Sequence, residues 1–265
     1  MPGLTDIAML TIFNGSQHVS VPVVSGRPVF IVGGNGSGKS ALVHALVSQL
    51  QGRNVIYIPG SRSNSFDQES LSLTPASRRQ LTVNFLSWDR SWETRWRNIS
   101  GTARNEKAIH DLQAADVQHI MDAANDIKVN GIASKGIKKL QSNDSPIDRV
   151  NSIMEQANLP VRMHIRNGEV QAIRGGVPYS IAKMSDGERA ALVLSAEVVS
   201  AMPASVFVLD EPELHLHRGI TLPLISILIK ERQDCGFIVS THELELPKQA
   251  SLALRTDGNI GLLLT

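Results

Sequence analysis

Residues 33–40 read GGNGSGKS, a glycine-rich stretch that ends in a lysine and a hydroxyl side chain. Glycines at this spacing let backbone N–H groups surround phosphate oxygens, the lysine reaches the β- and γ-phosphates, and the serine hydroxyl binds Mg²⁺. The stretch therefore predicts a phosphate-binding loop made by Gly33, Asn35, Gly36, Ser37, Gly38, Lys39 and Ser40. The sequence lacks the Asn-Lys-x-Asp stretch that is typical of guanine specificity, so we expect ATP rather than GTP.

A run of carboxylates after residue 209 is the second candidate for chemistry. Residues 205–209 read SVFVL, a buried-looking strand, and Asp210 and Glu211 follow directly. A carboxylate beside an apolar core is costly unless a cation meets it. In phosphate-loop enzymes such an aspartate holds Mg²⁺, and a glutamate can activate the attacking water. We expect Asp210 to bind Mg²⁺ with Ser40 and Glu211 to be catalytic; the plain alternative is a solvated turn.

These motifs need strands and helices that bring them to one place. Buried strands are predicted from apolar, β-branched runs at residues 29–32, 54–58, 206–209 and 237–240. Helical patterns occur at residues 40–50, 187–200 and 218–230. Strands that alternate with helices predict an α/β fold with a parallel sheet.

Three segments surround this core. Residues 7–26 predict a small antiparallel β-subdomain, and residues 161–182 and 251–265 predict further short strands. The polar, helical stretch between them predicts an inserted helical subdomain without the heptads of a long coiled coil. We divide the chain into residues 1–63 with the phosphate-binding loop, 64–160 as the inserted subdomain, and 161–265 as the C-terminal part of the core.

Composition excludes several classes of protein. The 265 residues are 42% hydrophobic and 19% charged, with a formal net charge of +1 and one cysteine. This balance is globular, offers no global attraction to nucleic acid or membrane, and allows no intrachain disulfide. The N-terminus lacks the pattern of a signal peptide, and no apolar run is long enough to span a bilayer. We expect a cytoplasmic protein with no membrane partner, and nucleic-acid binding stays open.

Two more motifs complete a set of four in a fixed order. Residues 184–190 read MSDGERA, and residues 238–243 read IVSTHE. The phosphate loop, this signature, the Asp-Glu pair and the histidine together resemble ABC-type ATPases. The stretch DEPELHLH at residues 210–217 resembles the soluble branch that includes RecF and OLD-family ATPases. Longer pieces, such as PYSIAKMSDGERAALVL, are similar to the ATPase subunit of PARIS-type anti-phage systems, which is associated with DUF4435/TOPRIM-like effectors.

The resemblance implies how the motifs work together. Ser185, Gly187 and Glu188 would contact ATP bound by another protomer, so the active site would be composite and the protein at least a homodimer. His242 would touch the γ-phosphate within its own chain and join Glu211 as a catalytic residue. ATP and Mg²⁺ would be the cofactors. A separate TOPRIM-like nuclease would be the effector, and a phage protein would be the trigger.

The sequence departs from the family pattern after residue 59. Transporter-type members have a glutamine where this chain has Gly60, and Arg62 or Gln68 is the candidate substitute. Phe13 is either a stacking partner of adenine or a sheet-core residue. His215 and His217 fall where a loop of the family crosses the protomer interface, and the alternative is helix capping.

All three tryptophans, Trp88, Trp92 and Trp96, lie four residues apart, which predicts one face of one helix. That face would pack on the ATPase core, contact a protomer or effector, or stack on nucleic acid.

Three other functions compete with an anti-phage ATPase. They are a RecF- or Rad50-like DNA-repair ATPase, a transporter nucleotide-binding subunit, and a nucleotide switch without catalysis. The near-neutral charge disfavours the first, the missing glutamine the second, and the presence of Glu211 and His242 the third.

Overall fold

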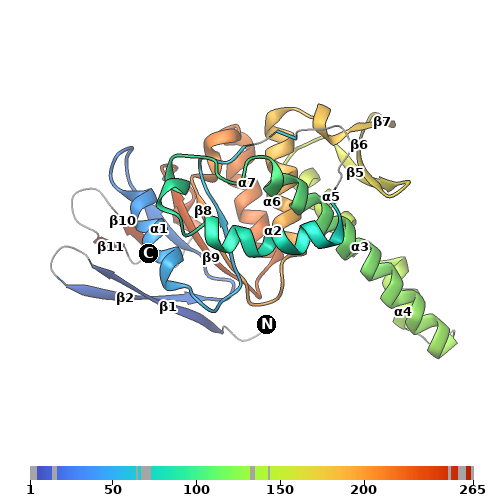
Figure 1. Cartoon of the computed structure of the whole chain (residues 1–265), viewed down its shortest axis with the longest axis horizontal. Helices are drawn as coiled ribbons and strands as arrows, with labels where there is room; N and C mark the ends of the chain where they lie inside the picture. Colours follow the sequence, from blue (N-terminus) through green and yellow to red (C-terminus); the bar gives the residue numbers. More distant parts are fainter. Residues whose placement is uncertain are drawn as a thin grey trace. The chain divides into compact units, whose positions relative to one another are not determined.

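The computed structural model describes residues 5–13, 17–63, 65–66, 73–131, 135–142, 144–249, 252–255 and 261–263. These residues form two compact units. Unit 1 contains residues 1–63, 82–101 and 201–265, and unit 2 contains residues 64–81 and 102–200. Each unit has its own sheet or sheets, as Figure 1 shows.

The centre of unit 1 is a six-stranded sheet. Its strands, in spatial order, are β11 (Gly261–Leu263), β10 (Leu252–Arg255), β3 (Val29–Val32), β9 (Gly236–Thr241), β8 (Val206–Asp210) and β4 (Val55–Ile58). Neighbours from β10 to β4 run parallel, and β11 is antiparallel to β10. Every residue of β3, β8 and β9 is buried, as expected for central strands of a parallel sheet that is covered on both faces. The predicted α/β fold with a parallel sheet is confirmed.

The register of this sheet brings three motifs to one edge. Val32 at the end of β3 lies opposite Thr241 on β9, and Ser240 of β9 lies opposite Asp210 on β8. The phosphate loop, the carboxylate run and the histidine motif follow these three neighbouring strands. The carboxyl ends of adjacent parallel strands are the usual place for a ligand in an open α/β sheet.

Helices and a second sheet cover this core. Unit 1 contains α1 (Lys39–Gln49), α7 (Arg218–Glu231) and the short helices η1 (Trp92–Arg95), η4 (Pro212–His215) and η5 (Pro247–Gln249). The sheet of β1 (Asp6–Phe13) and β2 (His18–Val24) is antiparallel, as predicted. Val43 and Leu46 of α1 share one core with Leu10 of β1 and Val208 of β8.

One glycine permits the close approach of β2 to the central sheet. A Cβ at Gly236 of β9 would lie 2.6 Å from Cγ1 of Val23. A side chain there would push the two sheets apart, so this position in the strand requires glycine.

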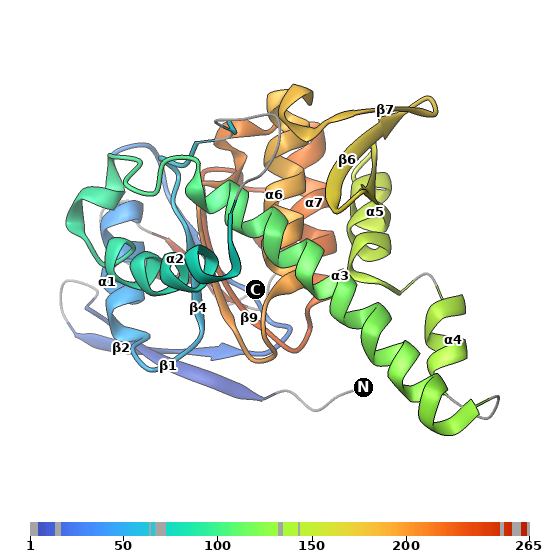
Figure 2. The same cartoon turned by 45° about the vertical axis from the view of Figure 1, so that its right-hand side comes forward.

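Unit 2 is mainly helical. It contains α3 (Ala103–Asn130), α4 (Lys135–Gln141), α5 (Pro146–Gln156), η3 (Ile181–Lys183) and α6 (Asp186–Ser200), and an antiparallel sheet of β5 (Arg162–Arg166), β6 (Glu169–Arg174) and β7 (Val177–Ser180). Helix α2 (Pro75–Trp88) crosses from unit 2 into unit 1. Figure 2 shows α4 beside the distal part of α3. They touch where Gly136 packs on the backbone of Ala123, and a Cβ at Gly136 would lie 2.3 Å from the Ala123 carbonyl oxygen.

The compact units differ from the predicted boundaries in two places. Residues 82–101, predicted to be part of the insertion, belong to unit 1, and residues 161–200, predicted to be part of the core, belong to unit 2. In residues 161–200 the predicted strands and helix are present, as β5, β6, β7 and α6. Which elements pack together depends on contacts between distant residues, and local patterns do not contain that information.

The single tryptophan helix was a wrong prediction. Helix α2 ends at Trp88, Trp92 begins η1, and Trp96 follows η1. Trp92 and Trp96 are 55% and 60% exposed, and their rings meet edge to face at 6.3 Å between centroids. The ring of Trp92 also meets the edge of His44 of α1, whose Nε2 lies 3.1 Å from the carbonyl oxygens of Arg90 and Ser91. The tryptophan segment therefore packs on the core of unit 1, the first of the predicted alternatives.

Candidate active site

The predicted phosphate-binding loop joins β3 to α1. Gly36 and Gly38 have φ angles of 79° and 90°, and a Cβ on either would meet no atom within 4 Å. Glycine is required here by the left-handed backbone, not by lack of space. Gly38 is the N-cap of α1 and has no side-chain oxygen that could cap the helix. The positive end of α1 is therefore available to an anion such as phosphate.

Lys39 is buried beside this loop, with 3% of its side chain exposed. Its Nζ donates to the carbonyl oxygens of Gly33 and Gly34, at 2.9 and 3.1 Å, and lies 3.2 Å from Oε1 of Glu211. A polyphosphate carries more charge than one carboxylate and can replace Glu211 as the partner of this ammonium group. The two carbonyls keep the lysine in place for that exchange.

Asp210, the last residue of β8, is 3% exposed. Its Oδ1 accepts hydrogen bonds from the Ser40 hydroxyl, at 3.4 Å, and from the Ser240 hydroxyl. Burial raises the pKa of the Asp210 carboxyl, and these hydrogen bonds offset only part of that effect. A bound cation would stabilise the ionised form of this buried carboxyl.

Glu211 occupies the turn that follows β8. Its φ angle is 46°, a left-handed conformation that costs a residue with a side chain about 1–3 kcal/mol. The backbone N–H of Glu211 is held by the carbonyl oxygen of Ser240 at 3.0 Å and by its hydroxyl at 3.2 Å. This turn directs Glu211 to Lys39 while Asp210 faces Ser40. The segment therefore forms a cluster with Lys39 and Ser40, and it is not the solvated turn that was the alternative interpretation.

Residues 57–246 match the model of the family AAA_21, described as "AAA domain, putative AbiEii toxin, Type IV TA system". The match covers more than half of the chain and includes Asp210, Glu211 and His242. The chain belongs to the AAA_21 family.

Several named proteins are similar to this AAA_21 chain at low sequence identity. The lipoprotein-releasing system ATP-binding proteins LolD of Bordetella pertussis and Bordetella parapertussis are each 24% identical over 243 residues, which cover 91% of this chain and 84% of theirs. An Smc head bound to the C-winged helix domain of ScpA has a TM-score of 0.50 at 16% identity, covering 94% of both chains. An Smc head with an extended coiled coil, bound to the C-terminal domain of ScpA derived from Pyrococcus furiosus, has a TM-score of 0.50 at 15% identity, covering 99% and 97%.

The likeness to the Smc heads concerns the fold, which is that of an ABC-type P-loop ATPase. With the family match, the chain is an AAA_21 ATPase that has this ABC-type fold.

The residues at the sheet edge fit Mg²⁺. The ion is usually held by one or two carboxylates, hydroxyls and the phosphates of its nucleotide, and Ser40 with Asp210 would supply such oxygens. Among the described residues, no group of three or more His, Cys, Asp or Glu side chains could hold a metal ion by itself, so the phosphates would have to complete the site. When bound, Mg²⁺ would neutralise charge on the β- and γ-phosphates.

The signature residues lie in unit 2, at the start of α6. Oε2 of Glu188 accepts from the backbone N–H and the hydroxyl of Ser185, at 3.1 and 2.9 Å, and Oε1 pairs with Arg174. The backbone N–H of Glu188 in turn donates to the Ser185 hydroxyl at 3.4 Å, which completes a capping box. Glu188 is 5% exposed, and its contacts with Ser185 stabilise the first turn of α6. Gly187 in the same turn has no side chain. Contact of Ser185, Gly187 and Glu188 with ATP of another protomer stays a prediction.

The segment after β4 has a structural role next to the cluster. A Cβ on Gly60 would lie 3.3 Å from the Asp210 carbonyl oxygen and 3.1 Å from Cδ1 of Leu214. Arg62 is 7% exposed and donates to the carbonyl oxygens of Pro212, at 3.0 Å, and Pro59, at 3.4 Å. Arg62 thus supports the turn that contains Glu211. Gln68, the other candidate, lies outside the described residues.

Two smaller predictions have clear outcomes. Phe13 is 56% exposed and meets the His18 ring at 5.3 Å, so it is not a sheet-core residue, and stacking on adenine stays a prediction. His217 is the N-cap of α7, and its Nδ1 accepts from the Gly219 N–H at 3.2 Å, so the capping interpretation is confirmed.

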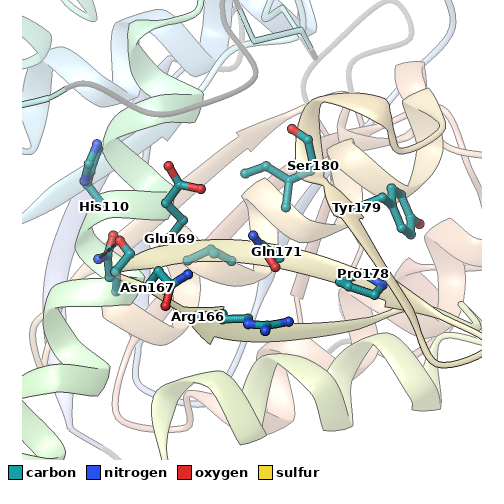
Figure 3. Close-up of a pocket in the computed structure, with 12 residues that line it drawn as sticks. His110, Arg166, Asn167, Glu169, Gln171, Pro178, Tyr179 and Ser180 are labelled. Carbon is teal, nitrogen blue, oxygen red and sulfur yellow. Dashed lines mark hydrogen bonds between the residues drawn. The ribbon is translucent and has the colours of Figure 1, made fainter.

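A cleft of about 470 Å³ lies in unit 2 between α3 and the sheet β5–β7. His110 and Glu169 lie toward one end of it and Ser180 toward the other, as Figure 3 shows. None of the predicted site residues lines this cleft. The predicted ATP site is instead the cluster of Lys39, Ser40, Asp210 and Glu211 at the sheet edge of unit 1.

Glu213 of η4 was not among the predicted site residues. It is 8% exposed, and its Oε1 lies within 3.0 Å of Thr241 Oγ1, the His242 backbone nitrogen and His242 Nδ1. The only sequence signal was its place in the acidic run at residues 210–213. Pairing with a histidine 29 residues later is visible only in the folded chain.

The raised pKa of Asp210 leads to an expected result for Asp210→Asn. Because the folded-state pKa lies above the unfolded-state value, ionised Asp210 opposes folding. Protonation of Asp210 favours the folded state. This contribution to the free energy of unfolding is fully present below the unfolded-state pKa and is lost as the pH rises through the folded-state pKa. Without nucleotide at neutral pH, Asp210→Asn should therefore raise the melting temperature, and the difference should shrink as the pH is lowered toward 4.

The same variant should lose the extra stability that Mg·ATP gives the wild type, because its neutral amide attracts Mg²⁺ less than a carboxylate does. Thermal unfolding with and without Mg·ATP, at several pH values, measures both effects. A lower melting temperature without nucleotide would contradict the account of a buried carboxylate whose ionisation opposes folding. Asp148→Asn on α5 of unit 2 is the matched control.

Proposed function

We propose that this AAA_21 ATPase is an ATP-driven switch of an anti-phage defence system, acting in the cytoplasm. The observation that carries the ATPase part is the meeting of Lys39, Ser40, Asp210 and Glu211 at the carboxyl ends of β3 and β8. In this proposal Lys39 binds the β- and γ-phosphates, Ser40 and Asp210 hold Mg²⁺, and Glu211 activates the water. His242 contacts the γ-phosphate.

ATP binding would join two copies of the chain. The signature residues Ser185 and Gly187 lie in unit 2, whereas the phosphate loop lies in unit 1, and each signature would act on the ATP of the other protomer. Binding would close the pair and hydrolysis would open it. The open and closed forms would control a separate TOPRIM-like nuclease in response to a phage protein. The motif similarity to PARIS-type systems supports this role, as does a family description that names a toxin system.

Mixing two inactive variants tests the composite site. Lys39→Ala removes the phosphate lysine and Ser185→Arg blocks the signature, so neither homodimer should hydrolyse ATP. A mixed pair has one site with an intact lysine and an intact signature. We expect an equimolar mixture to recover up to about a quarter of wild-type turnover, from half of the pairs with one working site each. Mixed oligomers that recover no hydrolysis would contradict the shared site.

The defence role needs a test in cells. Phage plating on a strain that expresses the chain and its genomic neighbour should fall relative to a strain with Lys39→Ala. Equal plating by both strains would remove the defence role but leave the ATPase assignment standing.

A DNA-repair ATPase is the second candidate, supported by the fold likeness to Smc heads. The formal net charge of +1 speaks against it, as does α3, which at 28 residues is far shorter than a long coiled coil. Affinity for DNA that falls steeply with salt would favour this function.

A transporter subunit is less well supported, because Gly60 occupies the place of the transporter glutamine. In the part of the chain that the structure describes, we found no helix with the length and apolarity to cross a membrane.

A further inference from the structure

The ring of His242 is held by a buried carboxylate from a different segment of the chain. Nδ1 of His242 lies 3.0 Å from Oε1 of Glu213. An ionised carboxylate has no proton to donate and can only accept hydrogen bonds. Nδ1 must therefore carry the proton in this contact. Nε2 is then the ring nitrogen that remains for a ligand, on a side chain that is 45% exposed.

Glu213 is itself positioned by the end of β9. Its Oε1 also accepts from the Thr241 hydroxyl at 2.7 Å and from the His242 backbone N–H at 3.0 Å. Three donors from two consecutive residues thus meet on one oxygen. The backbone and the hydroxyl hold the carboxylate even when the ring moves, so Glu213 can set the orientation of the ring.

The second carboxylate oxygen of Glu213, Oε2, indicates more than a structural role. Oε2 is buried and has no hydrogen-bond partner within the described part of the chain. An unsatisfied buried acceptor costs about 1–3 kcal/mol, more for a charged group. The side chain is 6% exposed, so little water screens its charge from the ring. This arrangement lowers the stability of the fold and places negative charge next to Nδ1 of His242.

We propose that Glu213 is the positioning residue for His242: it keeps the proton on Nδ1 and aims Nε2 outward. When Nε2 donates a hydrogen bond to an anionic phosphate, the ring carries two protons, and Glu213 supplies the opposite charge. A carboxylate that orients a histidine in this way usually contributes substantially to activity. The inference rests on the proposed contact between His242 and the γ-phosphate.

Spectroscopy of the full-length chain tests the orientation without any need for activity. Nitrogen-15 NMR of histidine-labelled protein reports which ring nitrogen carries the proton, and His242→Gln assigns the signals. At a pH where the ring is neutral, wild-type His242 should be in the Nδ1–H form. Glu213→Leu, which has no acceptor, should shift His242 toward the Nε2–H form that free imidazole side chains favour. Unchanged His242 signals in Glu213→Leu would overturn the proposal.

Kinetics separate positioning from stability. Glu213→Gln keeps an acceptor but loses the charge, and it should lower kcat about 10- to 100-fold, the usual range for loss of a histidine's orienting partner, with little change in KM. Glu213→Asp should recover part of this loss. Thr241→Val is the matched control, because it removes another donor from the same Oε1 and leaves the ring contact intact.

Thr241→Val should therefore lower stability but keep kcat. Equal losses of kcat in Thr241→Val and Glu213→Gln would show that the network is only structural and overturn the proposal. If the wild type itself hydrolyses no ATP, the proposed function fails, while the NMR result still decides the role of Glu213. If Glu213→Leu does not fold, Glu213→Gln and Glu213→Asp provide the kinetic decision.

Discussion

Lys39→Ala is expected to abolish ATP binding by this AAA_21 ATPase. The Lys39 ammonium is the cation that the structure places at the phosphate loop, held there by the carbonyl oxygens of Gly33 and Gly34. Without it, the β- and γ-phosphates would face the carboxylates of Asp210 and Glu211 with only Mg²⁺ and backbone N–H groups to offset the repulsion. Loss of hydrogen bonds between a charged lysine and phosphate costs about 1.5–3 kcal/mol each, so affinity should fall by at least about 100-fold.

Calorimetric titration with Mg·ATP measures this effect. Lys138→Ala on α4 is the matched control, since it removes an exposed lysine of unit 2 and should leave the affinity unchanged. Circular dichroism would verify that both variants are folded. Wild-type affinity in Lys39→Ala would refute the phosphate-loop assignment and the functions built on it.

Glu211→Gln is expected to slow ATP hydrolysis by roughly 10²–10⁴-fold, the usual range for a lost general base. Glutamine keeps the shape of the side chain but cannot take a proton from water. Binding should not suffer. In the wild type Glu211 lies 3.2 Å from Lys39, so it would compete with phosphate for the ammonium group, and a neutral amide would compete less. ATP affinity should therefore be equal to or tighter than that of the wild type.

The two effects together should trap the ATP-bound form. If two protomers close on ATP, Glu211→Gln should elute as a dimer with ATP and should keep a bound effector through purification. Binding by calorimetry, turnover by phosphate release, and mass by light scattering give the three readouts. Glu155→Gln on α5 serves as control. Turnover at the wild-type rate would remove Glu211 from catalysis and leave the metal site alone to explain the carboxylate run.

Asp210 and Glu211 show how adjacent residues acquire different partners, Ser40 for the first and Lys39 for the second. Their types and order in the chain predicted a metal ligand followed by a base. Their separation in space depends on the φ angle of 46° at Glu211, which is enforced by the bonds from its N–H to Ser240 on β9. Sequence patterns report local periodicity, and this conformation is imposed by a neighbouring strand.

Residues whose surroundings are set by tertiary contacts were the ones predicted least well. The spacing of Trp88, Trp92 and Trp96 matched a helix, but contacts of Trp92 with His44 and of Ser61 with the Thr94 carbonyl hold that segment in a short turn of helix on the core. Glu213 carried no motif of its own, and Arg62 was considered only as a substitute for the transporter glutamine. Both gain their partners, His242 and Pro212, through the packing of strands far apart in the chain.

The sequence by itself determined the parallel α/β fold, the phosphate loop and the order of the four motifs, because each depends on residue types at short, regular spacing. Only the tertiary structure decided which segments form each unit, how Glu211 turns toward Lys39, and which carboxylate holds His242. Those features arise where strands distant in sequence lie side by side and their burial forces polar groups to find partners across them.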